Sequence, residues 1–281
     1  MTRSVTASTL LAGVVGNPAR HSLSPVIHNA WIEAAGLDAV YVAIPSAPES
    51  FGDLIKGLAG GAALGVNVTI PFKESAAALA GEHSATAARA AAANVLIFRE
   101  GKILADNTDG VGLLAALGTA GFQAGSGPVA VLGAGGAARG AVTSLLAAGV
   151  PEVRVVNRSL DRTRAIAAID ARVGAFGWED VAAALDGVAA VINATSLGMT
   201  GQPPLELTLD AAPTSAVVMD MVYQPLKTAL LIEAENRGHP VADGLEMLIG
   251  QARPSFEAFF GCAPPDIDVR RLCEHALGEG P

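Results

Sequence analysis

Short apolar segments alternate with Ala-rich stretches along the whole chain of 281 residues. Apolar runs bounded by turn residues predict buried strands, and the longer Ala-rich stretches predict helices. In the first half the expected strands are residues 10–15, 40–44, 65–69, 94–98 and 103–105, the last two joined as a hairpin. The expected helices there are residues 25–35, 50–59, 71–80 and 110–120. This alternation is typical of α/β proteins with mostly parallel sheets.

The clearest interruption of the pattern is the Gly-rich segment 121–128. After it the alternation of strand and helix restarts, with strands expected at residues 129–132, 153–156, 190–192 and 216–219. Helices after Gly244 are expected to close the chain. A Gly-rich break favours a domain boundary, but helix 110–120 can belong to the domain on either side of it.

Composition narrows the possible partners and location. The chain has 27 acidic and 18 basic residues, giving a net charge of −9, which argues against nucleic acid or an anionic membrane as the main partner. No apolar stretch is long enough to span a membrane, and the N-terminus lacks the pattern of a signal peptide. Cys262 and Cys273 have no metal-ligand or redox spacing. We therefore expect a cytoplasmic protein with a small-molecule substrate.

The strand at 129–132 runs directly into a turn with the pattern G-x-G-x-x-A at Gly133, Gly135 and Ala138. Such a turn lets the backbone approach a diphosphate, which binds at the positive end of the following helix. The pattern alone is weak evidence, because Gly and Ala are abundant in this chain.

The end of the next strand identifies the dinucleotide more narrowly. NAD-specific sites place an acidic residue there to bind the ribose 2′-hydroxyl. Here the strand ends in Asn157, Arg158 and Ser159, with Arg162 following. A guanidinium can bind a 2′-phosphate through two hydrogen bonds, so the sequence favours NADP(H) over NAD(H). The alternative is a solvated basic start of a helix.

Lys73 stands apart from the other three lysines, because it follows a buried strand and a Pro turn. Asn67, Thr69 and Lys73 are expected to cluster at the carboxyl end of this strand, where α/β sheets bind ligands. A partly desolvated lysine can exchange protons near neutral pH, and Asp109 is its best candidate partner. The alternatives are a surface lysine and a plain helix cap. Hydride transfer to or from an alcohol must be accompanied by transfer of a proton, and a Lys–Asp pair can perform it without a metal.

A second candidate binding segment follows the first strand. Ser22 and Ser24 present two hydroxyl groups just before Pro25, at the expected start of a helix, which suits a carboxylate. The alternative is a plain capping loop. His21 and His28 lie nearby, but no third ligand at a suitable spacing indicates a metal site.

Together these segments closely resemble the shikimate dehydrogenase family. The motifs occur in the family's order over residues 16–251: GNPARHSLSP at Gly16, GVNVTIPFK at Gly65, NTDG at Asn107, GAGGAAR at Gly133, NRS at Asn157, INATSLGM at Ile192, DMVYQP at Asp220 and GLEMLIGQ at Gly244. The resemblance implies reversible reduction of 3-dehydroshikimate to shikimate by NADPH, in the route through chorismate to the aromatic amino acids.

The resemblance also implies roles for single residues, with Lys73 as proton donor and acceptor paired with Asp109. The implied substrate-binding residues are Ser22, Ser24, Asn67, Thr69, Asn94, Asp109, Tyr223 and Gln251. The implied cofactor-binding residues are Gly133, Ala134, Gly135, Gly136, Ala137, Asn157, Arg158, Ser159, Arg162, Thr195, Met221, Gly244 and Met247. Residues 92–95 depart from the family's usual GAVNT by lacking its Gly and Thr, and residues 228–229 are Thr-Ala where the family has Thr-Pro. We expect local repacking and no loss of binding.

The fold implied by the resemblance is an N-terminal α/β substrate domain and a doubly wound, Rossmann-type NADP domain with a cleft between them. Residues 1–108 would form the substrate domain, residues 109–244 the NADP domain, and residues 245–281 helices that return to the substrate domain. The chain would be a monomer or a homodimer. Two alternatives are a quinate/shikimate dehydrogenase of broader specificity, often using NAD, and a non-catalytic NADP-binding regulator. Arg158 and the Ser-Leu-Ser spacing favour the shikimate enzyme, and retention of Lys73 and Asp109 argues against the regulator.

Overall fold

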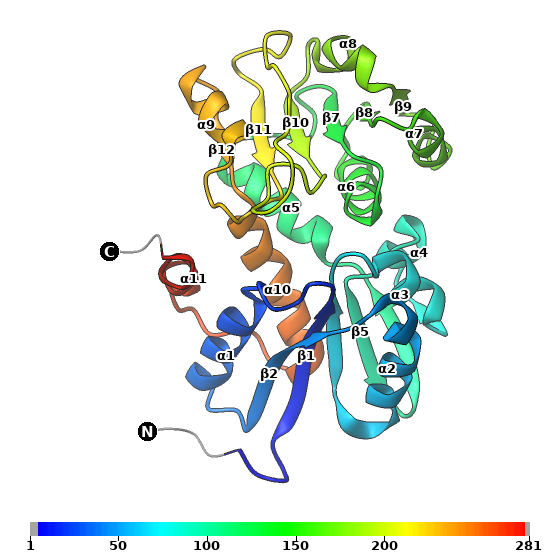
Figure 1. Ribbon diagram of the computed structural model, residues 1–281, viewed down its shortest axis with the longest axis vertical. Coiled ribbons are helices and arrows are strands. Elements are labelled where there is room, and N and C mark those ends of the chain that lie inside the picture. The colour runs from blue at the N-terminus through cyan, green and yellow to red at the C-terminus, as the bar shows by residue number, and fades with distance from the viewer. Residues whose placement is uncertain (1–4, 279–281) are drawn as a thin grey trace. The chain divides into compact units, whose positions relative to one another are not determined.

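The computed structural model describes residues 5–278 and divides them into two compact units (Figure 1). The first unit contains the residues up to Thr108 together with those from Gln251 onward, and the second unit is Asp109–Gly250. None of the described helices is long and apolar enough to cross a membrane. The predicted division at residues 108 and 244 into a substrate domain, an NADP domain and returning helices stays a prediction.

The first unit is built on a six-stranded sheet of order β2-β1-β3-β5-β6-β4. Its strands are β1 Leu10–Gly16, β2 Ala39–Pro45, β3 Gly65–Val68, β4 Glu82–His83, β5 Val95–Arg99 and β6 Lys102–Asp106. Its helices are α1 Ser24–Ala34, α2 Phe51–Gly57, α3 Lys73–Leu79, α4 Ala85–Ala90 and α11 Val269–Leu277, with the 3₁₀ turn Pro48–Ser50 and the π turn Leu58–Ala62. The helix α10, Gly244–Phe260, begins in the second unit and ends in the first.

Alternate residues of these strands point to opposite faces of the sheet. Val66 and Val68 of β3 pack into a core with α2, α3 and α4, whereas Asn67 between them bonds to Ser255 of α10 on the other face. In Figure 1, α1 lies beside β2, and α2 lies on the side of the first sheet opposite to α1. The pairs β3–β5 and β5–β6 are antiparallel, and β5 and β6 form the predicted hairpin.

The second unit is a fully parallel six-stranded sheet of order β12-β11-β10-β7-β8-β9. Its strands are β7 Val129–Leu132, β8 Val153–Val156, β9 Val173–Phe176, β10 Ala190–Asn193, β11 Val217–Asp220 and β12 Val241–Ala242. Its helices are α5 Asp109–Thr119, α6 Gly136–Ala147, α7 Leu160–Ala167, α8 Val181–Leu185 and α9 Ala229–Asn236, with the 3₁₀ turn Trp178–Asp180. This is the doubly wound order, whose direction of winding reverses between β7 and β10.

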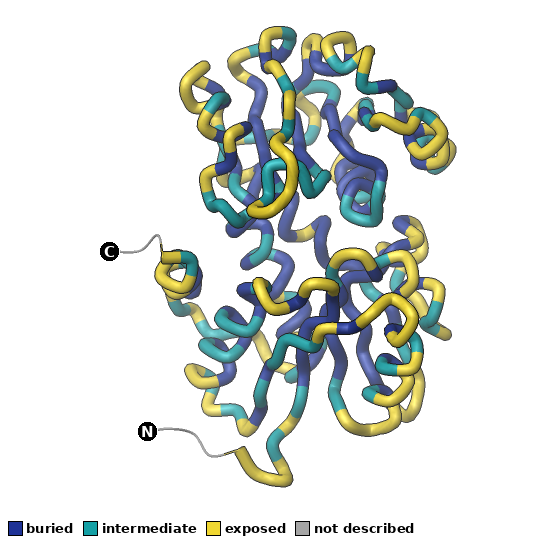
Figure 2. Tube along the Cα trace, in the orientation of Figure 1, coloured by how far each residue is buried: buried dark blue, intermediate teal, exposed yellow. Residues whose placement is uncertain are grey.

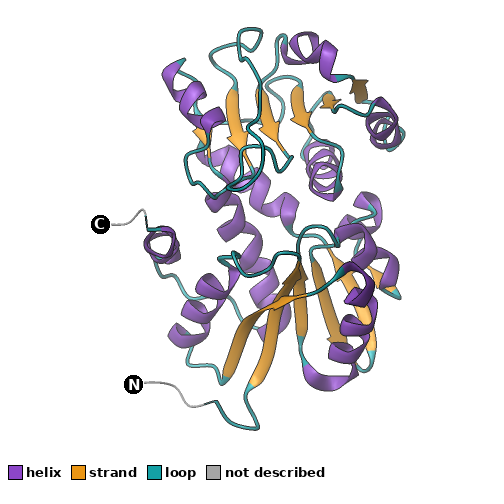
Figure 3. Cartoon of the chain, in the orientation of Figure 1, coloured by secondary structure: helices purple, strands orange, loops and turns teal. Residues whose placement is uncertain are grey.

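Both faces of the second sheet are covered, so its central strands β7, β10 and β11 are buried throughout (Figures 2 and 3). Val129 and Val131 of β7 pack with α5 and α6 on one face. Ala130 and Leu132 of the same strand pack with α8 and α9 on the other face. The continuous apolar strands recognised in the sequence are therefore interior strands.

The observed elements differ from the predicted ones mainly at their ends. Helix α3 begins at Lys73, two residues after the predicted start, because Phe72 N–H donates to Thr69 O in a turn before the helix. Helix α4 was not predicted and lies in the Ala-rich stretch 85–93, where Ser84 accepts a hydrogen bond from Ala87 N–H and so caps it. The short strands β4, β9 and β12 were also not predicted.

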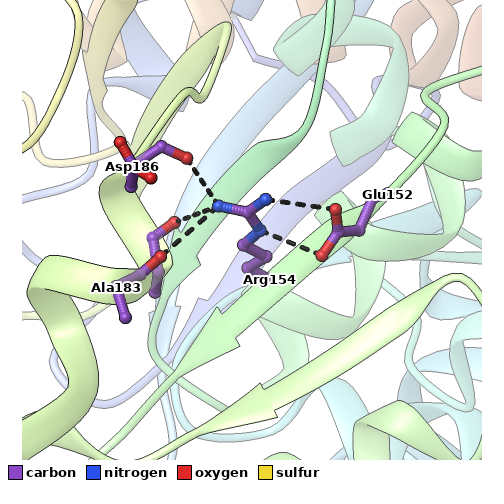
Figure 4. Close-up of polar contacts among 5 residues, drawn as sticks. Glu152, Arg154, Ala183 and Asp186 are labelled. Carbon is purple, nitrogen blue, oxygen red and sulfur yellow. Dashed lines mark hydrogen bonds and ion pairs between the residues drawn. The ribbon is translucent and has the colours of Figure 1, made fainter.

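Arg154 of β8 fastens the short helix α8 to the second sheet (Figure 4). Its Nη1 donates to the carbonyl oxygen of Asp186 at 2.7 Å and to those of Ala183 and Ala184 at 3.4 Å, which are unpaired acceptors at the end of the helix. Its Nε and Nη2 donate to both carboxylate oxygens of Glu152 at 2.9 and 3.2 Å. A positive charge at a helix carboxyl end is favourable, so Arg154 stabilises a helix of five residues that is too short to stand alone.

His28 of α1 lies in an aromatic cluster between that helix, the first sheet and α10. Its ring stacks on Tyr41 with a centroid distance of 4.1 Å and an interplanar angle of 4°, and Trp31 and Phe256 complete the cluster. The imidazole is fully buried, and neither of its nitrogens has a hydrogen-bond partner among the described residues. Burial lowers the pKa of His28 from 6.5 to about 3, so the ring stays neutral.

We predict that Arg154→Met lowers the free energy of unfolding by about 2–3 kcal/mol, because the carbonyl oxygens of α8 and the Glu152 carboxylate lose their shared donor. Urea unfolding measures this change. The matched control is Arg164→Met, which removes an exposed ion pair with Asp161 and should change stability by less than about 0.5 kcal/mol. Equal effects of the two changes would contradict this role of Arg154.

The stability of the first unit should fall with acidity because of His28. Its pKa is lower in the folded state than the unfolded value of 6.5, so its stability contribution is complete above pH 6.5 and is lost progressively toward pH 3. At pH 5 the loss is about 2 kcal/mol. His28→Phe retains a stacked ring and should reduce the difference in unfolding free energy between pH 7.5 and pH 5 by about that amount. An unchanged difference would show that His28 does not cause the acid sensitivity.

Candidate active site

Asn67 lies at the carboxyl end of β3 with every group of its side chain amide engaged. The Tyr41 hydroxyl donates to Asn67 Oδ1 at 2.7 Å. Asn67 Nδ2 donates to the carbonyl oxygen of Asn94 at 3.2 Å and to Ser255 Oγ at 3.0 Å. Only 5% of Asn67 is exposed, so these bonds replace those that the amide would make to water. These bonds thus hold Asn67, a predicted substrate-binding residue, in one position.

Asn94 anchors a second part of the same network. Its Oδ1 accepts from Thr108 N–H at 2.8 Å, and its Nδ2 donates to Thr108 Oγ1 and to Gln251 Oε1, each at 3.0 Å. Thr108 and Gln251 are also bonded directly, from Thr108 Oγ1 to Gln251 O at 3.0 Å. The structure therefore brings together three predicted substrate residues, Asn67, Asn94 and Gln251, from segments far apart in the sequence. The Ala residues that depart from the family pattern pack fully buried beside Asn94.

Lys73 is the first residue of α3 and is half-buried. Its carbonyl oxygen accepts from Ala93 N–H at 2.8 Å, which places the start of α3 next to the Asn94 segment. Thr69 N–H donates to Val15 O, so the turn before the helix is tied to β1. The backbone of Lys73 therefore lies next to the segment that contains the buried Asn94 amide.

The predicted carboxylate-binding loop leads into α1. Ser24 N–H donates to Ser22 Oγ at 3.2 Å, and Ser24 is the buried first residue of the helix, with Pro25 in its first turn. The two hydroxyl groups therefore lie at the amino end of a helix, as expected, where its dipole favours an anion.

The glycine turn of the second unit has a backbone geometry that would let a diphosphate approach it closely. Gly133 has φ of +112°, and a Cβ on it would lie 3.0 Å from both Ala194 O and Thr195 Cγ2, so only glycine fits between β7 and the loop after β10. A Cβ on Gly135 would meet no atom within 4 Å, and no side chain caps the amino end of α6 that follows it. The residues Gly133, Ala134, Gly135, Gly136 and Ala137 thus form an open turn at a helix N-terminus that can accept a diphosphate.

Arg158 and Arg162 follow β8, and both are exposed. No described residue forms an ion pair with either of them, whereas Arg164 pairs with Asp161. Asn157 Nδ2 donates to Ser159 O at 3.3 Å, and Arg162 N–H donates to the same oxygen, so this segment forms one compact turn. Two guanidinium groups without acidic partners in a chain of charge −9 suit a phosphate.

The sequence reasoning missed a buried network at the ends of β10 and β11. Asn193 and Asp220 are paired neighbours in the register, and both are fully buried. Asp220 accepts hydrogen bonds from Asn193 Nδ2, Val222 N–H and Thr228 Oγ1 at 2.9, 2.9 and 2.7 Å. Burial raises the pKa of Asp220, and these three donors oppose the rise. The available signal was a polar residue ending each of two continuous apolar strands.

This network positions Thr195, one of the predicted cofactor residues, and two others are placed by packing. Asn193 Oδ1 accepts from Thr195 N–H at 3.0 Å and from Thr195 Oγ1 at 2.7 Å. A Cβ on Gly244 would lie 2.5 Å from Met221 O, so α10 begins directly against the segment after β11. Met247 lies in the apolar core of the unit, with 8% of its surface exposed.

Asp109 and Tyr223 complete the placement of the predicted residues. Asp109 is the buried first residue of α5, with 5% of its surface exposed. Tyr223 is half-buried in the segment after β11. Among the described residues no group of three or more His, Cys, Asp and Glu side chains could hold a metal ion.

Two family models match the chain. Residues 14–96 match the shikimate dehydrogenase substrate binding domain, and residues 119–200 match shikimate / quinate 5-dehydrogenase. The NADP(+)-dependent shikimate dehydrogenase of Caulobacter vibrioides is 51% identical over 99% of this chain and 100% of its own length. The chain belongs to the shikimate dehydrogenase family.

Further relatives support this membership. The NADP(+)-dependent shikimate dehydrogenase of Paracoccus denitrificans is 47% identical over 93% of this chain and 94% of its own length. The structure of shikimate 5-dehydrogenase from Thermus thermophilus in complex with NADP(H) and shikimate is 34% identical, with a TM-score of 0.86. That likeness covers 95% of this chain and 99% of the other. The predicted family and the predicted α/β fold are thereby confirmed.

Proposed function

We propose that this protein is an NADP-dependent shikimate dehydrogenase, which reversibly reduces 3-dehydroshikimate to shikimate in the route to the aromatic amino acids. The observation that carries the proposal is 51% identity over nearly the full length to a relative of that name, which extends across both units. The buried amides of the first unit agree with it, as do Arg158 and Arg162, which form no ion pair with any described residue. The cytoplasmic location and the choice between monomer and homodimer stay predictions.

The first unit would bind the substrate. The buried amides of Asn67, Asn94 and Gln251 can form hydrogen bonds with the hydroxyl groups of the substrate ring. The hydroxyl groups of Ser22 and Ser24, at the amino end of α1, suit the substrate carboxylate. Thr69 and, from the second unit, Asp109 and Tyr223 complete the proposed substrate residues.

The second unit would bind NADP(H). The open turn at Gly133–Ala137 fits the diphosphate, and Arg158 with Arg162 fits the 2′-phosphate, because no carboxylate ends β8. Asn157, Ser159, Thr195, Met221, Gly244 and Met247 are the remaining proposed cofactor residues. When bound, NADP(H) supplies the hydride for reduction and accepts it in oxidation.

The chain's own residues would handle the proton. During reduction the substrate's carbonyl carbon gains a hydride and its oxygen must gain a proton, which we assign to the Nζ of Lys73. In the reverse direction Nζ takes the hydroxyl proton back. Asp109 is the proposed partner of Lys73 in this proton transfer. General acid–base catalysis of this kind contributes about 10²–10⁴-fold in rate.

The proposal is tested by assaying shikimate and quinate, each with NADP and with NAD, by the absorbance of the reduced nicotinamide. Shikimate with NADP should give the highest kcat/KM. The second family model also covers quinate dehydrogenases, so a comparable rate with quinate would favour the broader enzyme. No oxidation of either substrate would favour the non-catalytic regulator.

We predict that Lys73→Ala lowers kcat for shikimate oxidation by at least about 10²-fold, because the proton loses its acceptor. The dissociation constant for NADPH, measured by fluorescence titration, should be nearly unchanged. The control is Lys102→Ala, which removes an exposed lysine paired with Glu82 and should leave kcat intact. Near-normal turnover of the Lys73 variant would remove Lys73 from the mechanism.

We also predict that Arg158→Ala raises KM for NADPH by about 10–100-fold, since a hydrogen bond to a charged group contributes about 1.5–3 kcal/mol. KM for NADH should change little, because NADH has no 2′-phosphate. Arg164→Ala, which removes a neighbouring arginine already paired with Asp161, is the matched control. A similar rise for both cofactors would mean that Arg158 does not recognise the 2′-phosphate.

A further inference from the structure

Tyr41 of β2 reaches across β1 to Asn67 of β3. The parallel register pairs Tyr41 with Ala12 and Asn67 with Val14, so all four side chains lie on the same face of the first sheet. The small side chain of Ala12 leaves space for the phenol to extend over β1. Its hydroxyl then donates to Asn67 Oδ1 at 2.7 Å.

The phenol has little freedom to take another position. Tyr41 is 1% exposed, and the His28 ring stacks on it with an interplanar angle of 4°. Burial raises the pKa of Tyr41 well above 10, and hydrogen bonding with Ser24 only partly opposes that rise. The hydroxyl therefore keeps its proton and serves as a donor to Asn67.

The remaining hydrogen-bonding capacity of Asn67 can be counted. A side chain amide has two N–H donors and one oxygen with two lone pairs. Both donors are used, one by the backbone carbonyl of Asn94 and one by Ser255 Oγ. Since a carbonyl can only accept, the NH₂ group must face Asn94, and the oxygen must face Tyr41. One lone pair of Oδ1 is left for a ligand.

We infer, resting on the proposed function, that Tyr41 is a positioning residue that, together with the Asn94 carbonyl oxygen, holds the Asn67 amide so that it recognises a hydroxyl group of the substrate. Asn67 can only accept a further hydrogen bond, so the substrate must present a donor at that ring position. An amide free to rotate would bind a donor or an acceptor equally well. The locked amide favours a ring hydroxyl and disfavours an analogue that lacks it, because a polar group is then left unpaired.

The test is Tyr41→Phe, which removes only the hydroxyl group. KM for shikimate should rise about tenfold, with kcat and KM for NADP changed by less than about threefold, because the Asn67 carbonyl oxygen loses the donor that holds it. Analogues of shikimate in which one of the two hydroxyl groups that are not oxidised is replaced by hydrogen give a second measurement. For the analogue that lacks the hydroxyl group bound by Asn67, kcat/KM of the intact protein should be about tenfold or more below its value for shikimate. The corresponding loss in the Tyr41→Phe variant should be clearly smaller.

The matched control is Trp31→Phe, in the same aromatic cluster, whose indole nitrogen has no hydrogen-bond partner among the described residues. This change should lower the melting temperature and leave KM for shikimate and the discrimination unchanged. An equal rise in KM in both variants would overturn the inference, since packing alone would then explain it. The inference would also be overturned if the Tyr41→Phe protein had an unchanged KM for shikimate and the same discrimination against the analogues. Failure of the intact protein to oxidise shikimate is a separate result, which would overturn the proposed function itself.

Discussion

The structure depends on one constraint: polar side chains at the ends of buried strands must find hydrogen-bond partners within the protein. An amide or carboxylate taken out of water without such partners costs about 1–3 kcal/mol or more. Asn67, Asn94, Asn193 and Asp220 all lie at one end of a strand, and at most 5% of each is exposed. Their bonds extend to residues from distant parts of the sequence, so each bond also fixes the path of a loop.

The two units meet this constraint with different chemistry. In the first unit, two Asn amides bond to Tyr, Thr, Ser and Gln partners, which are neutral groups. The second unit uses a buried carboxylate, Asp220, and joins two loops through it. Three hydrogen-bond donors to one carboxylate hold together the loops after β10 and β11, which contain Thr195 and Met221.

Much of this arrangement could be predicted from the sequence. Continuous apolar strands, the glycine turn and the arginines after β8 are local signals, and the structure places them as expected. The tertiary bonds are not local. Nothing near Asn67 in the sequence indicates that Tyr41, Asn94 and Ser255 will use three of its four bonding positions. Helix α4 was missed because its Ala-rich sequence has no amphipathic pattern, so its N-cap at Ser84 was the only available sign.

The buried groups His28 and Asp220 give the two units opposite responses to acid. Protonation of His28 places a charge in an aromatic cluster, whereas protonation of Asp220, whose pKa is raised, removes a charge that burial disfavours. As the pH falls below 6.5, His28 weakens the first unit, whereas protonation of Asp220, whose pKa burial raises, does not weaken the second unit. The contribution of each buried group to acid stability is thus set by whether protonation adds a charge to the core or removes one.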